Sequence, residues 1–213
     1  MNDALLLVLL GMAAYLAGSV LFAPIVCRLW RLPDPRALGS GNPGATNVYR
    51  AGGWLPALVT LLLDAGKGWL PVWISAQLGQ PTMAQVMIAL CAVTGHMVPL
   101  FFRFQGGKGV ATALGAGLAL APATTLFMAV IWLSIMSYWR ISALASVTAA
   151  VFAPLISALL EPEALPLFAL MALLIVVRHR SNLIRLAQGR ELGFGPPRPG
   201  SNKPPKPPET PPD

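Results

Sequence analysis

Long apolar runs, separated by short glycine-rich and basic segments, constrain the fold of this chain more than any other feature. Charged residues make up 11% of the sequence, well below the ~25% typical of soluble domains, and the mean hydropathy is +0.65. Inside a bilayer, only helices and closed barrels satisfy every backbone hydrogen-bonding group. The runs are continuous rather than alternating, which favours helices. We therefore expect an all-α, polytopic integral membrane protein.

The apolar runs predict about seven transmembrane helices. Their expected ranges are 4–27, 54–77, 84–102, 109–121, 122–138, 141–160 and 164–178. The run at 109–121 is shorter than the ~20 residues that a transmembrane helix needs, so we expect this helix to be tilted, broken or shielded by protein. The residues after 178 could form an interfacial helix that ends near Gly189.

The placement of charge predicts the orientation in the membrane. Every Lys and Arg except Lys67 lies between the apolar runs, at their ends or in the C-terminal segment. Basic segments of this kind stay on the cytoplasmic side. The first run is preceded only by Asn2 and Asp3 and is followed by Arg28, so we expect a retained helix rather than a signal peptide. The N-terminus is then outside and the C-terminus cytoplasmic.

Composition divides the chain into two parts. Residues 1–192 are expected to form one transmembrane domain, and 193–213, rich in Pro and Lys, a disordered cytoplasmic tail. The formal net charge of +7 follows from the charge asymmetry across the membrane, so we expect no nucleic-acid partner. Cys27 and Cys91 lie on different apolar runs without Cys or His neighbours, which argues against a disulfide or a metal site.

A glycine-rich polar segment follows the first apolar run and reads Gly-Ser-Gly-Asn-Pro-Gly-Ala-Thr-Asn-Val-Tyr-Arg over 39–50. Its glycines and its proline are expected to prevent a regular helix, and glycine N–H groups can converge on an anion. The side chains that could contact such an anion are Ser40, Asn42, Thr46, Asn47 and Arg50. The segment is neither a Walker A loop nor a Gly-x-Gly-x-x-Gly fingerprint. On this segment alone, phosphate binding and a plain turn between helices remain alternatives.

Three ionisable residues lie within apolar runs. Asp64 and Lys67 are three residues apart, so they share a helix face and can pair. Such a pair is either a link between helices or part of a functional site. His96 lies near a helix end that Pro99 terminates, where a hydrogen-bonded structural histidine is the more frequent role.

A second glycine-rich loop precedes the short apolar run. It places Lys108 between Gly107 and Gly109, at the expected start of a helix. Backbone N–H groups at a helix N-terminus and a nearby lysine both favour anions. This loop is expected on the same side of the membrane as the first.

Later in the chain, two further groups of polar residues accompany the basic ends of the runs. Ser142 and Ser146 are four residues apart on one helix face, although a serine in an apolar helix commonly bonds its own backbone. His179 lies between Arg178 and Arg180, whose like charge disfavours the protonated imidazole. With all these elements on one face, the expected partner is a phosphorylated small molecule.

In this order the motifs resemble the bacterial acyl-phosphate-dependent glycerol-3-phosphate acyltransferases, the PlsY family. The matching motifs are Gly39-Ser40-Gly41-Asn42-Pro43-Gly44-Ala45-Thr46-Asn47 with Arg50, Asp64-x-x-Lys67-Gly68, Gly95-His96 with Pro99, Gly106-Gly107-Lys108-Gly109-Val110-Ala111-Thr112, and His179-Arg180-x-Asn182 with Arg185, Leu186 and Gly189. The resemblance covers about residues 1–192 and excludes the Pro-rich tail.

The resemblance implies a reaction at the membrane surface. The sn-1 hydroxyl of glycerol 3-phosphate would attack the carbonyl of an acyl phosphate, giving lysophosphatidic acid and inorganic phosphate, the first acylation of phospholipid synthesis. The family does not use the His-x-x-x-x-Asp motif of other acyltransferases, and neither His96 nor His179 has an Asp five residues later. A bacterial inner-membrane location follows, with the active site facing the cytoplasm. Neither a cofactor nor a metal is expected.

The resemblance also implies roles for individual residues. The expected catalytic residues are Ser40, Lys108, His179 and Asn182. The expected substrate-binding residues are Asn42, Gly44, Thr46, Asn47, Arg50, Gly107, Gly109, Ser142 and Ser146, with Ser142 a weaker candidate than Ser146. Asp64, Lys67 and His96 are expected to support the site. The general base is left open between His179 and a phosphate oxygen of the substrate.

Two other classes of membrane protein share some of these sequence features. A transporter of phosphorylated metabolites could also have short or broken helices and basic loops, but it should show internal repeats and polar groups on both sides of the membrane. An enzyme of the CDP-alcohol type needs several metal-binding carboxylates on its helices, which Asp64 alone cannot supply. The sequence sets no acyl-chain preference and no oligomeric state.

Overall fold

The structure, a computed structural model, describes residues 3–195, and within that range the only regular elements are helices. Most of the expected tail, residues 196–213, lies outside the described part. The α-helices are α1 (Asp3–Gly18), α2 (Phe22–Leu29), α3 (Ala45–Gly52), α4 (Trp54–Gln77), α5 (Thr82–Met97), α6 (Val110–Leu120), α7 (Pro122–Trp139), α8 (Ser142–Leu160), α9 (Leu165–Arg178) and α10 (Arg180–Ala187). Short 3-10 turns occupy Pro35–Ala37, Leu100–Phe102 and Pro162–Ala164.

Within residues 3–195, four helical segments are long and apolar enough to cross a membrane, or six if each of two bent pairs counts as one span. The bent pairs are α1 with α2, at 41°, and the segment containing α9 with α10, at 59°. Helix α6 has 11 residues, so the expectation of a short fourth helix is confirmed, as is the all-helical integral membrane fold. The expected helix after residue 178 is α10.

The expectation of one continuous helix over 4–27 is wrong, because the chain leaves the helix between α1 and α2. In a continuous helix the N–H of residue 24 would donate to the carbonyl of Val20, but Pro24 has no N–H. Lys67 Nζ donates to this carbonyl instead, at 2.5 Å. A lysine from α4 thus satisfies a backbone group that the break would otherwise leave unpaired within the apolar layer.

The expectation of no regular helix in 39–50 is wrong for its second half. Helix α3 begins at Ala45, directly after Gly44, and runs to Gly52. The breaking residues all lie upstream, where Gly39 and Gly41 adopt positive φ angles of 53° and 70°. From Ala45 onward no glycine or proline interrupts the chain until the helix end, so a short helix can form.

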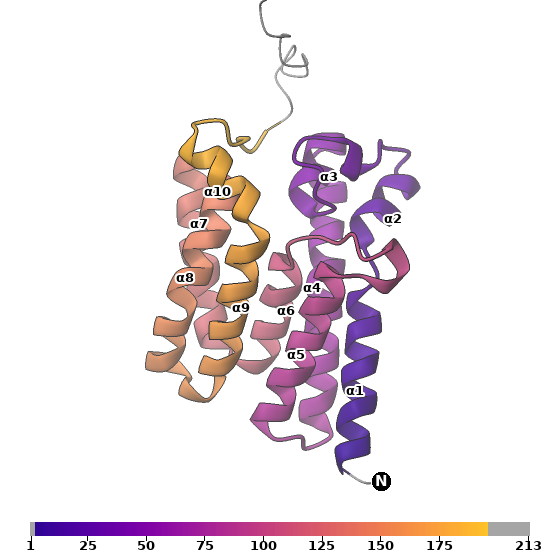
Figure 1. The fold of residues 1–213 in the computed structure, drawn as a ribbon, viewed down its shortest axis with the longest axis vertical. Helices are drawn as coiled ribbons and strands as arrows, with labels where there is room; N and C mark the ends of the chain where they lie inside the picture. The colour runs from indigo at the N-terminus through magenta and orange to yellow at the C-terminus, as the bar shows by residue number, and fades with distance from the viewer. Residues whose placement is uncertain (1–2, 196–213) are drawn as a thin grey trace, which may run out of the picture.

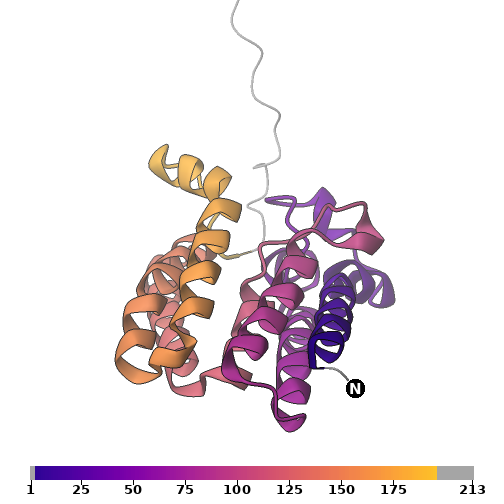
Figure 2. The same ribbon diagram turned by 60° about the horizontal axis from the view of Figure 1, so that its bottom comes forward.

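The helices form two groups that lie side by side. Helix α4 packs on α5 and α6 and α1 on α5, whereas α8 packs on α7 and α9. Figures 1 and 2 show these groups beside each other, with α3, α10 and the loop before α6 toward one end and the N-terminus at the other.

Two glycines allow α4 and α6 to cross closely. A Cβ at Gly68 would meet the Thr112 carbonyl, and one at Gly115 would meet the Ala65 carbonyl. Small residues at such crossings let helix backbones approach in membranes. The crossing fixes the start of α6, and with it Lys108, relative to α4.

Candidate active site

The first glycine-rich loop is organised by one buried side chain. Asn47, 1% exposed, donates from Nδ2 to the carbonyls of Pro35, Leu38 and Asn42 at 3.2, 3.0 and 3.0 Å. Its Oδ1 accepts a hydrogen bond from Arg50 Nη1 at 2.6 Å. Asn47 was expected beside a phosphate, but its amide is committed within the loop and acts on the site through Arg50.

Arg50 and Tyr49 connect α3 to the segment after α10. Arg50 Nη2 donates to the Gly193 carbonyl at 2.9 Å, and the Tyr49 and Phe194 rings stack at 4.4 Å between centroids. The Phe194 N–H donates to the Arg140 carbonyl at 2.5 Å. Gly193 and Phe194 belong to the expected tail, yet they contact the site.

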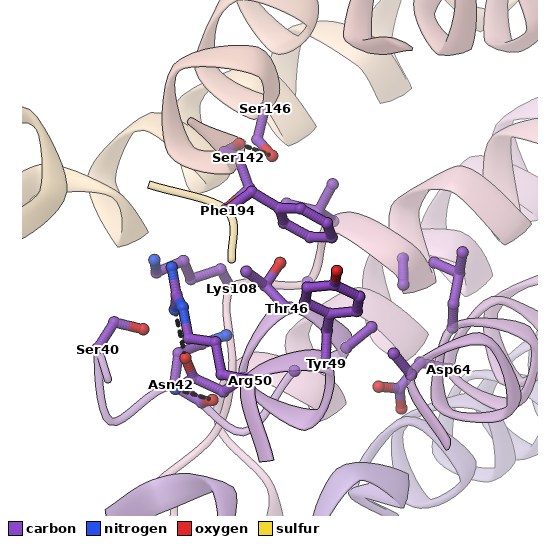
Figure 3. Close-up of a pocket in the computed structure, with 18 of the residues that line it drawn as sticks. Ser40, Asn42, Thr46, Tyr49, Arg50, Asp64, Lys108, Ser142, Ser146 and Phe194 are labelled. Carbon is purple, nitrogen blue, oxygen red and sulfur yellow. Dashed lines mark hydrogen bonds between the residues drawn. The ribbon is translucent and has the colours of Figure 1, made fainter. Parts of the chain in front are cut away.

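Lys108 extends from the second loop toward the same part of the molecule as Arg50 (Figure 3). The pKa of Lys108 is lowered from 10.5 to about 8, mainly by burial; the positive charges of Arg185, Arg50 and Arg178 act in the same direction, and Glu191 opposes them. Burial also lowers the pKa of Arg50, again opposed by Glu191. Several cations thus converge with little solvent around them, which favours binding of a polyanion.

The bend between α9 and α10 supplies a histidine and an asparagine. His179 Nδ1 lies 2.8 Å from the Ile175 carbonyl, which can only accept, so Nδ1 carries the hydrogen and Nε2 of the neutral ring is left for another partner. Asn182 Nδ2 donates to Glu191 Oε1 at 2.6 Å, while Asn182 Oδ1 is buried without a partner among the described residues. Arg185 Nε donates to Glu191 Oε2 at 2.9 Å.

The two serines of α8 differ in their availability. Ser146 Oγ donates to the Ser142 carbonyl at 2.8 Å and accepts from Trp132 Nε1 at 3.0 Å. The expected bonding of a helical serine to its own backbone is therefore confirmed for Ser146. The Ser142 hydroxyl has no such partner in the described part of the chain, so it is freer to meet a ligand than Ser146, the reverse of the expected ranking.

The charged pair within α4 forms as expected. Lys67 Nζ lies 2.7 Å from Asp64 Oδ1, and His96 Nδ1 lies 3.7 Å from the same oxygen. All three side chains are buried. Asp64 and His96 reach the cavity described next, whereas Lys67 points to the break between α1 and α2.

A cavity of about 450 Å³ brings the predicted residues together. The predicted residues that line it are Ser40, Asn42, Gly44, Thr46, Asn47, Arg50, Asp64, His96, Lys108, Gly109, Ser142, Ser146, His179 and Asn182. Gly107 and Lys67 do not line it. The expected co-location of the glycine-rich and basic segments is thus confirmed.

The cavity also has lining residues that the sequence analysis missed, notably Tyr49, Trp132, Glu191 and Phe194. A lone acidic residue just after a basic helix could have singled out Glu191 as a partner for Asn182 and Arg185. Phe194 is the only aromatic residue of the sequence 193–213, which could have singled it out. Its partner Tyr49 could not be predicted, because the two residues are far apart in the sequence.

A second, apolar cavity of about 300 Å³ adjoins the first between α6, α7, α8 and α9. Leu61, Val110, Ala111, Trp132 and Ser146 line both. The residues further along are small or apolar, among them Ala149, Ala150 and Ala153 of α8 and Phe168 of α9. The charged cavity therefore continues into a space suited to a hydrocarbon chain.

The cationic, glycine-rich cavity and the apolar cavity share part of their lining. Together they suit an amphipathic ligand with an anionic head, which is the class of ligand expected for a membrane protein that acts on lipids. The family model described as glycerol-3-phosphate acyltransferase matches residues 8–189. The chain belongs to this family, and is an acyltransferase.

Individual relatives agree with this assignment. The chain is 53% identical to the glycerol-3-phosphate acyltransferase of Hahella chejuensis, over 84% of this chain and 92% of the relative. It is 46% identical to the glycerol-3-phosphate acyltransferase of Methylobacillus flagellatus, over 92% of this chain and 98% of the relative. A crystal structure of PlsY, an integral membrane glycerol 3-phosphate acyltransferase, in its glycerol 3-phosphate form is similar at a TM-score of 0.83, 39% identity and coverage of 89% and 96%. The lysophosphatidic acid form of PlsY is similar at a TM-score of 0.81 and 37% identity, over 89% of this chain and 95% of the PlsY chain.

Proposed function

We propose that this protein transfers a fatty acyl group from acyl phosphate to the sn-1 hydroxyl of glycerol 3-phosphate. The products are lysophosphatidic acid and inorganic phosphate. The observation that carries the proposal is the continuity of the two cavities: one holds cations and glycine-rich backbone, the other is apolar, and they meet at Trp132 and Ser146. Glycerol 3-phosphate and the phosphate of the donor suit the first cavity, and the acyl chain suits the second.

The cationic residues have a physical task in this reaction. Both substrates carry negative charge, so their approach is opposed by repulsion. Arg50 and Lys108 offset it and hold the reactants in place. We assign Ser40, Asn42, Gly44 and Thr46 to the surroundings of a phosphate, since they line the same cavity in a glycine-rich loop.

Transfer is expected to be direct. The attacking hydroxyl oxygen forms a bond to the acyl carbonyl carbon, the bond from that carbon to the phosphate oxygen breaks, and the hydroxyl proton leaves with a base. Phosphate is a good leaving group, so no strong acid is needed. The base is either His179 Nε2 or an oxygen of the substrate phosphate. Asn182 Oδ1, buried and unpartnered among the described residues, is placed to accept a hydrogen bond from a glycerol hydroxyl.

We further propose that the site faces the cytoplasm of a bacterium, with the protein in the inner membrane and the N-terminus outside. Helices α3 and α10, which lie toward one end of the molecule (Figure 1), contain Arg50 and the pair Arg180 and Arg185, and the positive-inside rule assigns basic segments to the cytoplasmic side. A reporter that fluoresces only in the cytoplasm tests this. Fluorescence from an N-terminal rather than a C-terminal fusion would refute the orientation.

The activity is tested by product analysis with purified protein. Wild type is given glycerol 3-phosphate with acyl phosphate, acyl-CoA or acyl carrier protein as donor, beside Lys108→Ala and the exposed control Arg28→Ala. We expect lysophosphatidate only from acyl phosphate, a loss of ~100-fold or more in Lys108→Ala and none in Arg28→Ala. Lysophosphatidate from another donor would overturn the donor assignment. Binding of glycerol 3-phosphate without turnover from any donor would favour a transporter.

A further inference from the structure

Arg178, at the end of α9, braces the second glycine-rich loop from outside the cavity. Its Nε donates to the Gly107 carbonyl at 3.1 Å, and its Nη2 donates to the carbonyls of Gly106 and Gly107, each at 2.9 Å. Arg178 does not line the cavity. Its planar fork therefore binds two consecutive carbonyls of the loop rather than a ligand.

The opposite side of the loop rests on His96. The Gly107 N–H donates to the His96 carbonyl at 3.1 Å, and a Cβ at Gly107 would collide with His96 Nε2. The loop is thus held between a buried imidazole, 4% exposed, and the guanidinium of Arg178. A loop that contains several glycines has many accessible conformations, so these two contacts select one of them.

The selected conformation leaves two backbone donors of the loop without a partner among the described residues. In a trans peptide the C=O and the N–H point in opposite directions. With the Gly107 carbonyl turned to Arg178, the N–H of Lys108 points away from it. In residues 3–195 the N–H groups of Lys108 and Gly109 have no acceptor, and both residues line the cavity. Gly109, at a φ of 76°, then begins α6.

We infer that Arg178 is a positioning residue: by binding the carbonyls of Gly106 and Gly107 it directs the loop's amides and Lys108 at the phosphate of a substrate. The identity of that anion rests on the proposed function. Arg178 acts through the loop and does not touch the substrate. Its removal should therefore weaken phosphate binding through the same loop as removal of Lys108.

The test compares Arg178→Ala and Arg178→Lys with Lys108→Ala and a control, Arg180→Ala. Arg180 is exposed, makes no hydrogen bond through its side chain within the described residues and lies outside the cavity. Its replacement by alanine therefore removes a positive charge near the loop but no contact that holds the loop. KM is measured for each substrate, together with kcat and the thermal unfolding midpoint. Calorimetry with glycerol 3-phosphate and with inorganic phosphate measures anion binding independently of turnover.

In Arg178→Ala, KM should rise roughly tenfold, the loss expected when a charge-assisted hydrogen bond is removed. Both Arg178→Ala and Lys108→Ala should raise the KM of the same substrate. In Arg178→Ala, kcat should change less than KM. Arg178→Lys should fall between wild type and Arg178→Ala, because an ammonium keeps the charge and one donor but not the fork. Arg180→Ala should match wild type.

Three outcomes would overturn the inference. The first is an equal KM rise in Arg180→Ala, which would make charge alone the cause. The second is a fall in kcat with KM unchanged, and the third is a rise in the KM of the other substrate only. If Arg178→Ala does not fold, Arg178→Lys replaces it in the test, and a KM for Arg178→Lys equal to that of wild type would also overturn the inference. Wild-type protein that binds anions but does not use acyl phosphate would refute the proposed function, and calorimetry on the variants would still decide the role of Arg178.

Discussion

At the scale of single residues, the surroundings of Lys108 lower its pKa and so determine the pH range in which it is charged. Burial lowers its pKa to about 8, so in the empty site Lys108 loses its proton just above neutral pH rather than near 10.5. The like charges of Arg185 and Arg50 act in the same direction. A phosphate bound in the cavity would stabilise the protonated form and raise this pKa again.

This pKa predicts a pH dependence of substrate binding. Below about pH 8 Lys108 is protonated, the form that the proposed function needs to bind phosphate; as pH rises through about 8 the free enzyme loses this charge. We expect kcat/KM to fall above that pH. In Lys108→Arg the guanidinium stays protonated, so the fall should move to clearly higher pH even if the maximal rate is lower. A fall with an unchanged midpoint in Lys108→Arg would assign the titration to another group.

At the scale of helices, the close crossing of α4 and α6 sets the position of the second loop. Gly68 of α4 has no room for a side chain, because a Cβ there would meet the backbone of Thr112 and Ala116. Gly66 lies two residues earlier on the same helix, and a Cβ there would have no neighbouring atom within 4 Å among the described residues. These two glycines form a matched pair for testing the crossing.

Gly68→Ala should destabilise the protein by about 1–3 kcal/mol, the usual cost of overpacking. Gly66→Ala should be neutral or gain about 0.5–1 kcal/mol, because alanine favours the helix. Thermal unfolding in detergent measures both. Equal midpoints for the two variants would show that α4 and α6 do not cross as closely as described.

Residues of α8 line the apolar cavity, so we expect substitutions there to change which acyl-chain lengths of the donor are used. Ala149 lines this cavity, whereas Val151 on the same helix is 56% exposed on the outer surface. Ala149→Leu should fill part of the space and lower kcat/KM for long acyl phosphates more than for short ones, by roughly tenfold for about 1.4 kcal/mol of lost binding. Val151→Leu should leave the chain-length profile unchanged. A profile unaffected by Ala149→Leu would place the acyl chain elsewhere.

Hydropathy predicted where the long apolar helices lie, and 54–77 coincides with α4. The expected number of about seven spans compares with four candidate spans within residues 3–195, or six if each bent pair counts as one. It missed the break before α2 because that break depends on one absent N–H, at Pro24, and on a donor from a different helix, Lys67. The glycine-rich motifs predicted part of the cavity lining, namely Ser40, Asn42, Gly44, Thr46, Asn47, Arg50, Lys108 and Gly109. The bracing contacts of Asn47 and Arg178 could not be predicted, since each partner is set by tertiary packing rather than by local spacing.

At the scale of the whole molecule, residues from both groups of helices line the cavity, and Figure 1 shows these two groups side by side. Helices α3, α4 and the start of α6 supply one wall, and α7, α8 and the bend after α9 supply the other. The short α6 begins within the bundle rather than at its end (Figure 1). Its first residues, Val110 and Ala111, line both the charged and the apolar cavity, and Lys108, just before them, lines the charged one. A soluble phosphate and a membrane-embedded chain can therefore meet in one site.

The central claim is that both substrates meet in this cavity and react directly, without an acylated enzyme. The measurement that tests it is the time course of phosphate release from acyl phosphate, recorded with and without glycerol 3-phosphate at high enzyme concentration. We predict no release, and no initial burst, until glycerol 3-phosphate is added. A burst equal to the amount of enzyme in its absence would show an acyl-enzyme intermediate and contradict direct transfer.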